Sequence, residues 1–126
     1  MSSDSTYEIE FYDDSKSPDM EKRREGSHFW ITALDANDDS ILSLYKNNWG
    51  SKMDYLFSED GFVETALTVK GDDLKRLMQL CDNADSVKQV ADYLYKRFSP
   101  DMYRAYLNIS EWLKENKITT SYWSWP

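Results

Sequence analysis

Residues 62–81, FVETALTVKGDDLKRLMQLC, contain the change of pattern that decides the fold. Up to Val69, alternate side chains share one face, as they do in a strand: Val63, Thr65, Leu67 and Val69. Beyond Gly71, apolar side chains recur with the spacing of one helix face: Leu74, Leu77, Met78 and Cys81. Asp72 is a natural N-cap for that helix. The chain is therefore expected to pass from strand to helix at Gly71.

The part of the chain before this change has the pattern of an antiparallel meander. Alternating apolar and polar side chains, separated by turn residues, predict strands at residues 7–11, 28–34, 41–45, 53–57 and 62–69. The segment 28–34 is apolar on both faces, which is typical of a central strand. Residues 35–40 are the turn that follows it, Asp60-Gly61 is a hairpin signal, and Ser17-Pro18-Asp19 can begin a short helix that Gly26 ends.

Two further helices and a strand are expected after Cys81. The second helix begins at Asp85 or Ser86 and continues to Phe98. Ser99-Pro100-Asp101 is the start signal of a third helix, which ends near Lys117 and buries Met102, Ala105, Tyr106, Ile109 and Leu113. Residues 118–123 can return as a C-terminal edge strand. The prediction is a single α+β domain over residues 1–126, with residues 1–6 disordered, in which an antiparallel β-meander of about five strands precedes three helices packed on one face.

The negative charge of the chain is concentrated in its first half. The net charge is −8; residues 1–64 carry fifteen acidic and six basic side chains, whereas residues 65–126 carry eight acidic and nine basic ones. Such a field attracts basic partners and repels nucleic-acid phosphates. We therefore expect a basic protein partner, no nucleic-acid partner, and a binding surface drawn from Glu8, Glu10, Asp13, Asp14, Asp35, Asp38, Asp39, Asp54, Glu59, Asp60 and Glu64.

The C-terminal residues are unusually rich in aromatic side chains. Trp123 and Trp125 stand two residues apart, so in a strand they point to the same side. Trp is a favoured anchor of protein interfaces, which makes both residues candidates for partner binding. The alternative is a final strand whose indoles cover the core.

The sequence offers little for an enzyme. Its single histidine is His28, expected at the surface of a strand, and its single cysteine is Cys81, expected on the apolar face of a helix. No G-x-S-x-G motif is present to support a serine nucleophile. Glu8 and Glu10 lie on the polar face of their strand, where solvation keeps both carboxylates ionised. We therefore predict no catalytic residues.

Metal and cofactor sites are not predicted either. Residues 35–39 match the opening of a calcium loop, but position six is Ser40 rather than glycine and position twelve is Lys46 rather than glutamate. The sequence has no Cys/His cluster for zinc, and its four glycines are too scattered to form a phosphate-binding loop. The segment 35–40 is accordingly interpreted as a hairpin turn.

The expected compartment is the cytoplasm. One cysteine cannot form an intrachain disulfide, and the start of the chain, MSSDSTYEIE, has neither the basic nor the apolar region of a secretory signal. No apolar run approaches the roughly 18 residues typical of a membrane span.

In length, acidity, aromatic content and lack of catalytic residues, the chain resembles the small single-domain immunity proteins of bacterial toxin systems, including those of contact-dependent inhibition. The resemblance implies a cognate toxin partner, a nuclease above all, neutralised by binding at or beside its active site. It carries over no site residue. The alternatives are a DNA mimic, an adaptor or regulatory protein, and a small carboxylate-dependent enzyme with His28 as its outside candidate.

Overall fold

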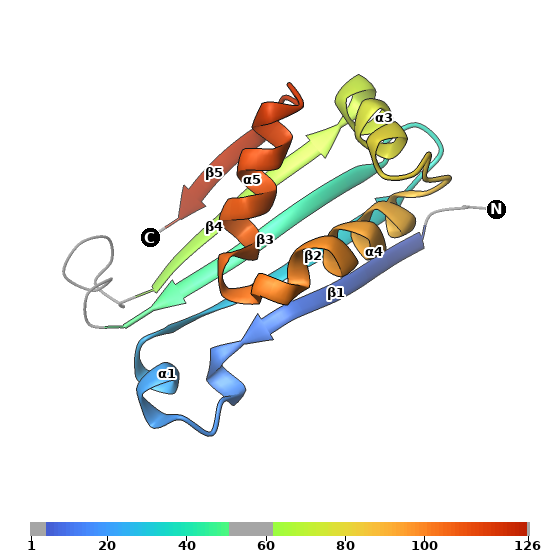
Figure 1. Cartoon of the computed structure of the whole chain (residues 1–126). Coiled ribbons are helices and arrows are strands. Elements are labelled where there is room, and N and C mark those ends of the chain that lie inside the picture. The colour runs from blue at the N-terminus through green and yellow to red at the C-terminus, as the bar shows by residue number, and fades with distance from the viewer. Residues whose placement is uncertain (1–4, 51–61, 126) are drawn as a thin grey trace.

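The structure, a computed structural model, describes residues 5–50 and 62–125. Five strands form one antiparallel sheet in the order β1-β2-β3-β4-β5, and the three longer helices lie together on one side of it (Figure 1). The strands are β1 (Ser5–Asp13), β2 (Gly26–Asp35), β3 (Ile41–Trp49), β4 (Phe62–Lys70) and β5 (Ser121–Trp125). The helices are α1 (Met20–Arg24), α3 (Gly71–Leu80), α4 (Val87–Phe98) and α5 (Ala105–Glu115), with 3₁₀ turns η1 (Asp14–Lys16) and η2 (Ser99–Arg104). The predicted α+β class, with a C-terminal edge strand, is confirmed.

The core lies between the sheet and α3, α4 and α5. Alternate residues of the interior strands enter it, because successive side chains of a strand point to opposite faces. Phe29 is fully buried and its ring stacks on Phe11, with ring centroids 4.5 Å apart. The buried side chains of sheet and helices form one cluster, which includes Ile31, Ala33, Leu42, Leu44, Leu67, Val69, Leu74, Leu77, Val87, Val90, Leu94, Ile109 and Leu113.

The start of α3 differs from the prediction, whereas the start of α4 agrees with it. Helix α3 begins at Gly71, so Asp72 lies in the first turn and is not the N-cap; that position belongs to Lys70. Gly71 has a φ of +63°, a left-handed conformation that glycine adopts freely, and it lets the chain enter the helix directly from β4. Helix α4 does begin after Ser86, whose side chain accepts a hydrogen bond from the Gln89 amide.

The third predicted helix begins later than its start signal. Residues 99–104 form the 3₁₀ turn η2, in which Asp101 has non-helical backbone angles (φ −121°, ψ 65°), and α5 starts only at Ala105. Met102 consequently leaves the apolar helix face and is 37% exposed, so its predicted burial is wrong. Tyr106 is half-buried, whereas Ala105, Ile109 and Leu113 are buried as expected.

The strand ends also shift. Ser5 and Thr6 pair with Asp35 and Leu34, so these two residues, predicted to be disordered, belong to β1. The C-terminal strand is Ser121–Trp125 rather than residues 118–123, since Ile118 is buried in the core before the strand begins. The strand predicted at residues 53–57 and the Asp60-Gly61 hairpin lie outside the described residues.

Candidate functional site

The side of the sheet opposite α3, α4 and α5 is referred to below as the open face (Figure 1). Strand β2 illustrates it: Phe29, Ile31 and Ala33 are fully buried on the helix side, whereas His28, Trp30 and Thr32 point the other way and stay half-buried. Strand β2 is an interior strand as predicted, but the helices cover only one of its faces. The second face of β2, which carries Trp30 and Thr32, is therefore part of the open face.

The register of the sheet aligns the open-face side chains in three rows that cross all five strands. The first row, from β1 to β5, is Glu10, Trp30, Tyr45, Ala66 and Trp123. The second is Asp13, His28, Asn47, Glu64 and Trp125. The third is Glu8, Thr32, Ser43, Thr68 and Ser121. Carboxylates therefore gather at the β1 edge, and the two tryptophans of the C-terminal strand stand at the β5 edge.

The middle of the open face is aromatic. The Trp30 ring stacks on Tyr45 with centroids 5.4 Å apart, and the His28 ring stacks on Trp30 at 4.3 Å. Ala66, which pairs with both Tyr45 and Trp123, is fully buried. Trp123 and Trp125 are 43% and 68% exposed, so their indoles do not cover the core. The face thus presents flat aromatic surface to solvent, which is typical of a binding surface.

A bulge in β1 places a second carboxylate beside Glu10. The pairing of β1 with β2 shifts between Glu10 and Tyr12, which leaves Phe11 as the extra residue. Residues three apart in a regular strand point to opposite faces, but the bulge brings Asp13 to the same face as Glu10. Phe11 and Tyr12 are both buried. This apolar pair interrupts the alternation of residues 7–11, and it is the sequence signal that could have predicted the bulge.

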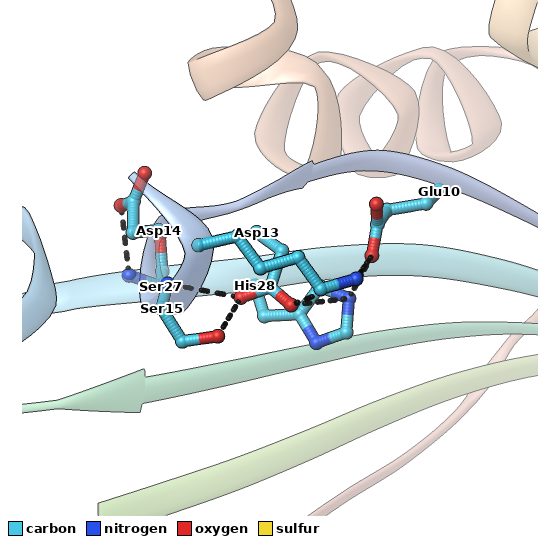
Figure 2. A network of polar contacts seen from close by, with 7 residues as sticks. Glu10, Asp13, Asp14, Ser15, Ser27 and His28 are labelled. Atoms are coloured by element: carbon cyan, nitrogen blue, oxygen red, sulfur yellow. Dashed lines mark hydrogen bonds and ion pairs between the residues drawn. The ribbon is translucent and has the colours of Figure 1, made fainter. Parts of the chain in front are cut away.

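Glu10, Asp13 and His28 converge as a result (Figure 2). His28 Nε2 lies 2.9 Å from Glu10 Oε1 and 4.0 Å from Asp13 Oδ2. The ammonium group of Lys16 lies 3.9 Å from Glu10 Oε1 and 3.7 Å from Asp13 Oδ2. Ser15 donates two hydrogen bonds to Asp13 Oδ1, from its amide at 3.0 Å and its hydroxyl at 2.6 Å. Glu8, Glu10, His28 and Trp30 also line a shallow hollow of about 430 Å³.

Asp13 is ionised at neutral pH. Partial burial raises its pKa, but the hydrogen bonds from Ser15 and the nearby His28 ring and Lys16 ammonium oppose that effect, and the pKa of Asp13 is lowered overall. The group of two carboxylates, one imidazole and one ammonium can therefore hold a proton or a cation between its members.

Two of the predicted acidic residues are used inside the fold. Asp14 is 6% exposed, and its carboxylate accepts hydrogen bonds from the Ser27 amide at 3.0 Å and the Tyr103 hydroxyl at 3.3 Å. Asp35 accepts from the amides of Val87 and Lys88, at 2.7 and 3.1 Å, and so binds the N-terminus of α4. The function of these two carboxylates in the structure is to hold η1 and α4 in place.

The other predicted acidic residues are spread over the molecule. Asp38 and Asp39 are exposed in the turn between β2 and β3, at the opposite end of β2 from His28. Glu64 lies on the open face beside Trp125. Asp54, Glu59 and Asp60 lie outside the described residues. The structure therefore brings together Glu8, Glu10, Asp13 and Glu64 on one face, with Trp123 and Trp125.

Cys81 takes no part in this face. Its side chain is 3% exposed in the core, and burial raises the pKa of its thiol to about 12. A thiol that remains protonated at neutral pH is a poor nucleophile, which agrees with a packing role.

Comparison with known proteins gives no relative. A scan against protein-family models, a search of curated proteins and a search of solved structures each found no match. None of the helices in the described part of the chain is both long and apolar enough to cross a membrane.

Proposed function

We propose that this chain is a protein-binding inhibitor that takes a basic protein on its open face. The specific form of the proposal is an immunity protein that neutralises a cognate toxin, with a nuclease as the favoured class. One observation carries it: an open face on which no helix of residues 5–50 and 62–125 packs, and which combines stacked aromatic side chains with a margin of carboxylates.

The aromatic part of the open face supplies contact area at low entropic cost. Trp and Tyr dominate the residues that contribute most to protein interfaces, and Trp30, Tyr45, Trp123 and Trp125 all belong to this face. A strand of nine residues, such as β3, is about 30 Å long, and five strands are roughly 20 Å across. The resulting footprint of roughly 600 Å² approaches the ~800 Å² that each partner of a stable complex contributes.

The acidic part of the open face accounts for the choice of a basic partner. Glu8, Glu10 and Asp13 lie at the β1 edge, and Glu64 lies in the row that ends at Trp125. Carboxylates around an apolar centre speed up association with a positive surface and disfavour other partners. A nuclease cleft is positive because it holds phosphates, so it has the complementary charge.

The arrangement of the carboxylates is less suited to a DNA mimic. Mimicry requires a long regular series of unneutralised charges at phosphate-like spacing. On the open face, Lys16 and His28 lie against Glu10 and Asp13, and most of the remaining surface is aromatic or hydroxyl-bearing. These features favour one specific protein over many nucleic-acid-binding ones.

The proposal is tested by affinity capture from a nuclease-treated lysate of the source organism, washed at low and at high salt. We expect one basic protein in stoichiometric amount at high salt, and we expect the pure chain to inhibit its nuclease activity. Many nucleic-acid-binding proteins that elute at high salt would support mimicry instead. A captured protein whose activity is unaffected by the chain would refute the proposal that the chain is an inhibitor.

A further inference from the structure

We propose that Glu10, Asp13 and His28 form a binding site for a divalent transition metal, best fitted by Zn²⁺, and that Lys16 is the cation the metal displaces. The site shares Glu10 and Asp13 with the proposed partner-binding face, but all its ligands are side chains of this chain, so metal binding can be measured without the partner. Its three ligand atoms come from β1 and β2 and lie within 4.8 Å of one another.

The spacing of the three atoms fits a bound ion. Ligand atoms about 2.0–2.2 Å from a metal, at tetrahedral to right angles, are roughly 3.0–3.5 Å apart. The distances from His28 Nε2 to Glu10 Oε1 and Asp13 Oδ2 are 2.9 and 4.0 Å, one on each side of that range. All three atoms lie within 4.8 Å of one another, so a bound ion would draw the more distant ones together by about 1 Å.

Two of the ligands are already oriented. Both hydrogen bonds from Ser15 go to Asp13 Oδ1, which leaves Oδ2 directed at His28 and Lys16. The side chain of Asp13 is only 9% exposed, and the His28 ring is held by its stack on Trp30. Ligands held by strands and by a second layer of contacts lose little freedom when the ion binds.

The charge of the site already attracts a cation. The Lys16 ammonium lies between the two carboxylates, at 3.9 and 3.7 Å, which is longer than a hydrogen-bonded ion pair. Its side chain is 74% exposed, so little holds it in place. A doubly charged ion that bonds directly to both carboxylates interacts more strongly than this ammonium does.

The ligand types select the class of metal. One imidazole nitrogen with two carboxylate oxygens suits Zn²⁺ and its neighbours in the first transition series, with water at the remaining position. Ca²⁺ and Mg²⁺ prefer oxygen ligands throughout and gain little from an imidazole nitrogen. The preference expected is therefore Zn²⁺ or Co²⁺ over Ca²⁺ and Mg²⁺.

The test is calorimetric titration of the pure chain with Zn²⁺, repeated with Co²⁺, whose visible absorption reports the number and type of ligands. We expect one ion per chain. His28→Gln and Asp13→Asn should each weaken binding about tenfold or more, and Lys16→Met should strengthen it several-fold because the competing cation is removed. Asp38→Asn is the control, an exposed carboxylate in the turn at the opposite end of β2 from His28, and should leave the affinity unchanged.

Either of two results would overturn the proposal. One is that neither the unmodified chain nor the Lys16→Met variant binds Zn²⁺. The other is that the His28→Gln variant binds Zn²⁺ as tightly as the unmodified chain does. Circular dichroism of each variant verifies the fold. If one ligand variant does not fold, the comparison of Lys16→Met with Asp38→Asn still tests the proposal, because an equal Zn²⁺ affinity in these two variants contradicts the displacement of Lys16.

Discussion

The two faces of the sheet have similar apolar patterns and different surroundings. Along β2, Phe29, Ile31 and Ala33 alternate with Trp30, Thr32 and Leu34, so both faces contain large apolar side chains. The first set is fully buried beneath the helices, and the second set remains partly exposed on the open face. Apolar periodicity therefore indicates which residues share a face, but not what covers that face. The proposed binding function rests on an aromatic face that no helix of the described residues covers.

The largest expected difference between the faces is in stability. Phe29→Ala removes a fully buried ring and should lower the free energy of unfolding by about 3–5 kcal/mol. Trp30→Ala, one residue further on, should lower it by about 1 kcal/mol, because that ring is partly exposed and mainly loses its two stacks. Urea denaturation measures the free energy of unfolding of both variants. Equal losses for the two positions would mean that the open face is covered as well.

A second prediction separates structural from binding carboxylates. Asp35→Ala removes two hydrogen bonds at the N-terminus of α4 and should cost about 1–2 kcal/mol of stability without changing partner affinity. Asp38→Ala, in the same turn but exposed, should change stability by less than about 0.5 kcal/mol. Thermal unfolding compares the two variants. A loss of partner affinity in a folded Asp35→Ala protein would return Asp35 to the binding surface.

A third prediction concerns the helix side, where Cys81 is buried. Its native pKa is about 12 and the unfolded value is near 9.0, so above pH 9 the unfolded chain loses the proton first. Stability should therefore fall between about pH 9 and pH 12, and it should fall less in Cys81→Ala, which lacks this thiol. At pH 8 a thiol reagent should react slowly with the native protein and rapidly in urea. Fast reaction of the native protein would place Cys81 at an accessible site.

The smallest expected effect is that of single charges on the open face. Glu8→Gln and Glu64→Gln together should slow association with the basic partner several-fold at low salt and reduce its salt dependence, with chain stability unchanged. The control is Glu111→Gln together with Glu115→Gln, which removes the same number of charges from exposed positions of α5 on the other side. Stopped-flow mixing at two salt concentrations measures the rates. Equal slowing by the control would point to net charge rather than to this face.

Local pattern predicted the parts of the structure that depend on short stretches of sequence. The alternation in β4, the helical spacing after Gly71 and the Ser86 cap each involve a few adjacent residues, and all are present. The start of α5 was missed because Asp101 leaves the helical conformation after Pro100. The start signal Ser99-Pro100-Asp101 does not indicate that the backbone of Asp101 is non-helical.

The arrangement of the open face could not be predicted from local sequence, because it depends on tertiary structure. Its three rows follow from the register of five strands, which brings Trp123 into line with Trp30 across 93 positions of sequence. The sequence assigns Asp35 to the binding surface because nothing in it shows that its partner is the start of α4, about 50 residues away. The meeting of Glu10, Asp13 and His28 required the bulge, of which the Phe11-Tyr12 pair was the only local sign.

The most direct test of the account measures the affinity of the captured partner for two double variants. Trp30→Ser with Trp123→Ser alters the open face, and Leu80→Ser with Leu107→Ser alters exposed leucines of α3 and α5. The account predicts that the open-face variant binds about 30-fold or more weakly, equivalent to roughly 2 kcal/mol, and that the helix variant stays within about twofold of the unmodified chain. Weak binding by the helix variant and normal binding by the folded open-face variant would contradict it.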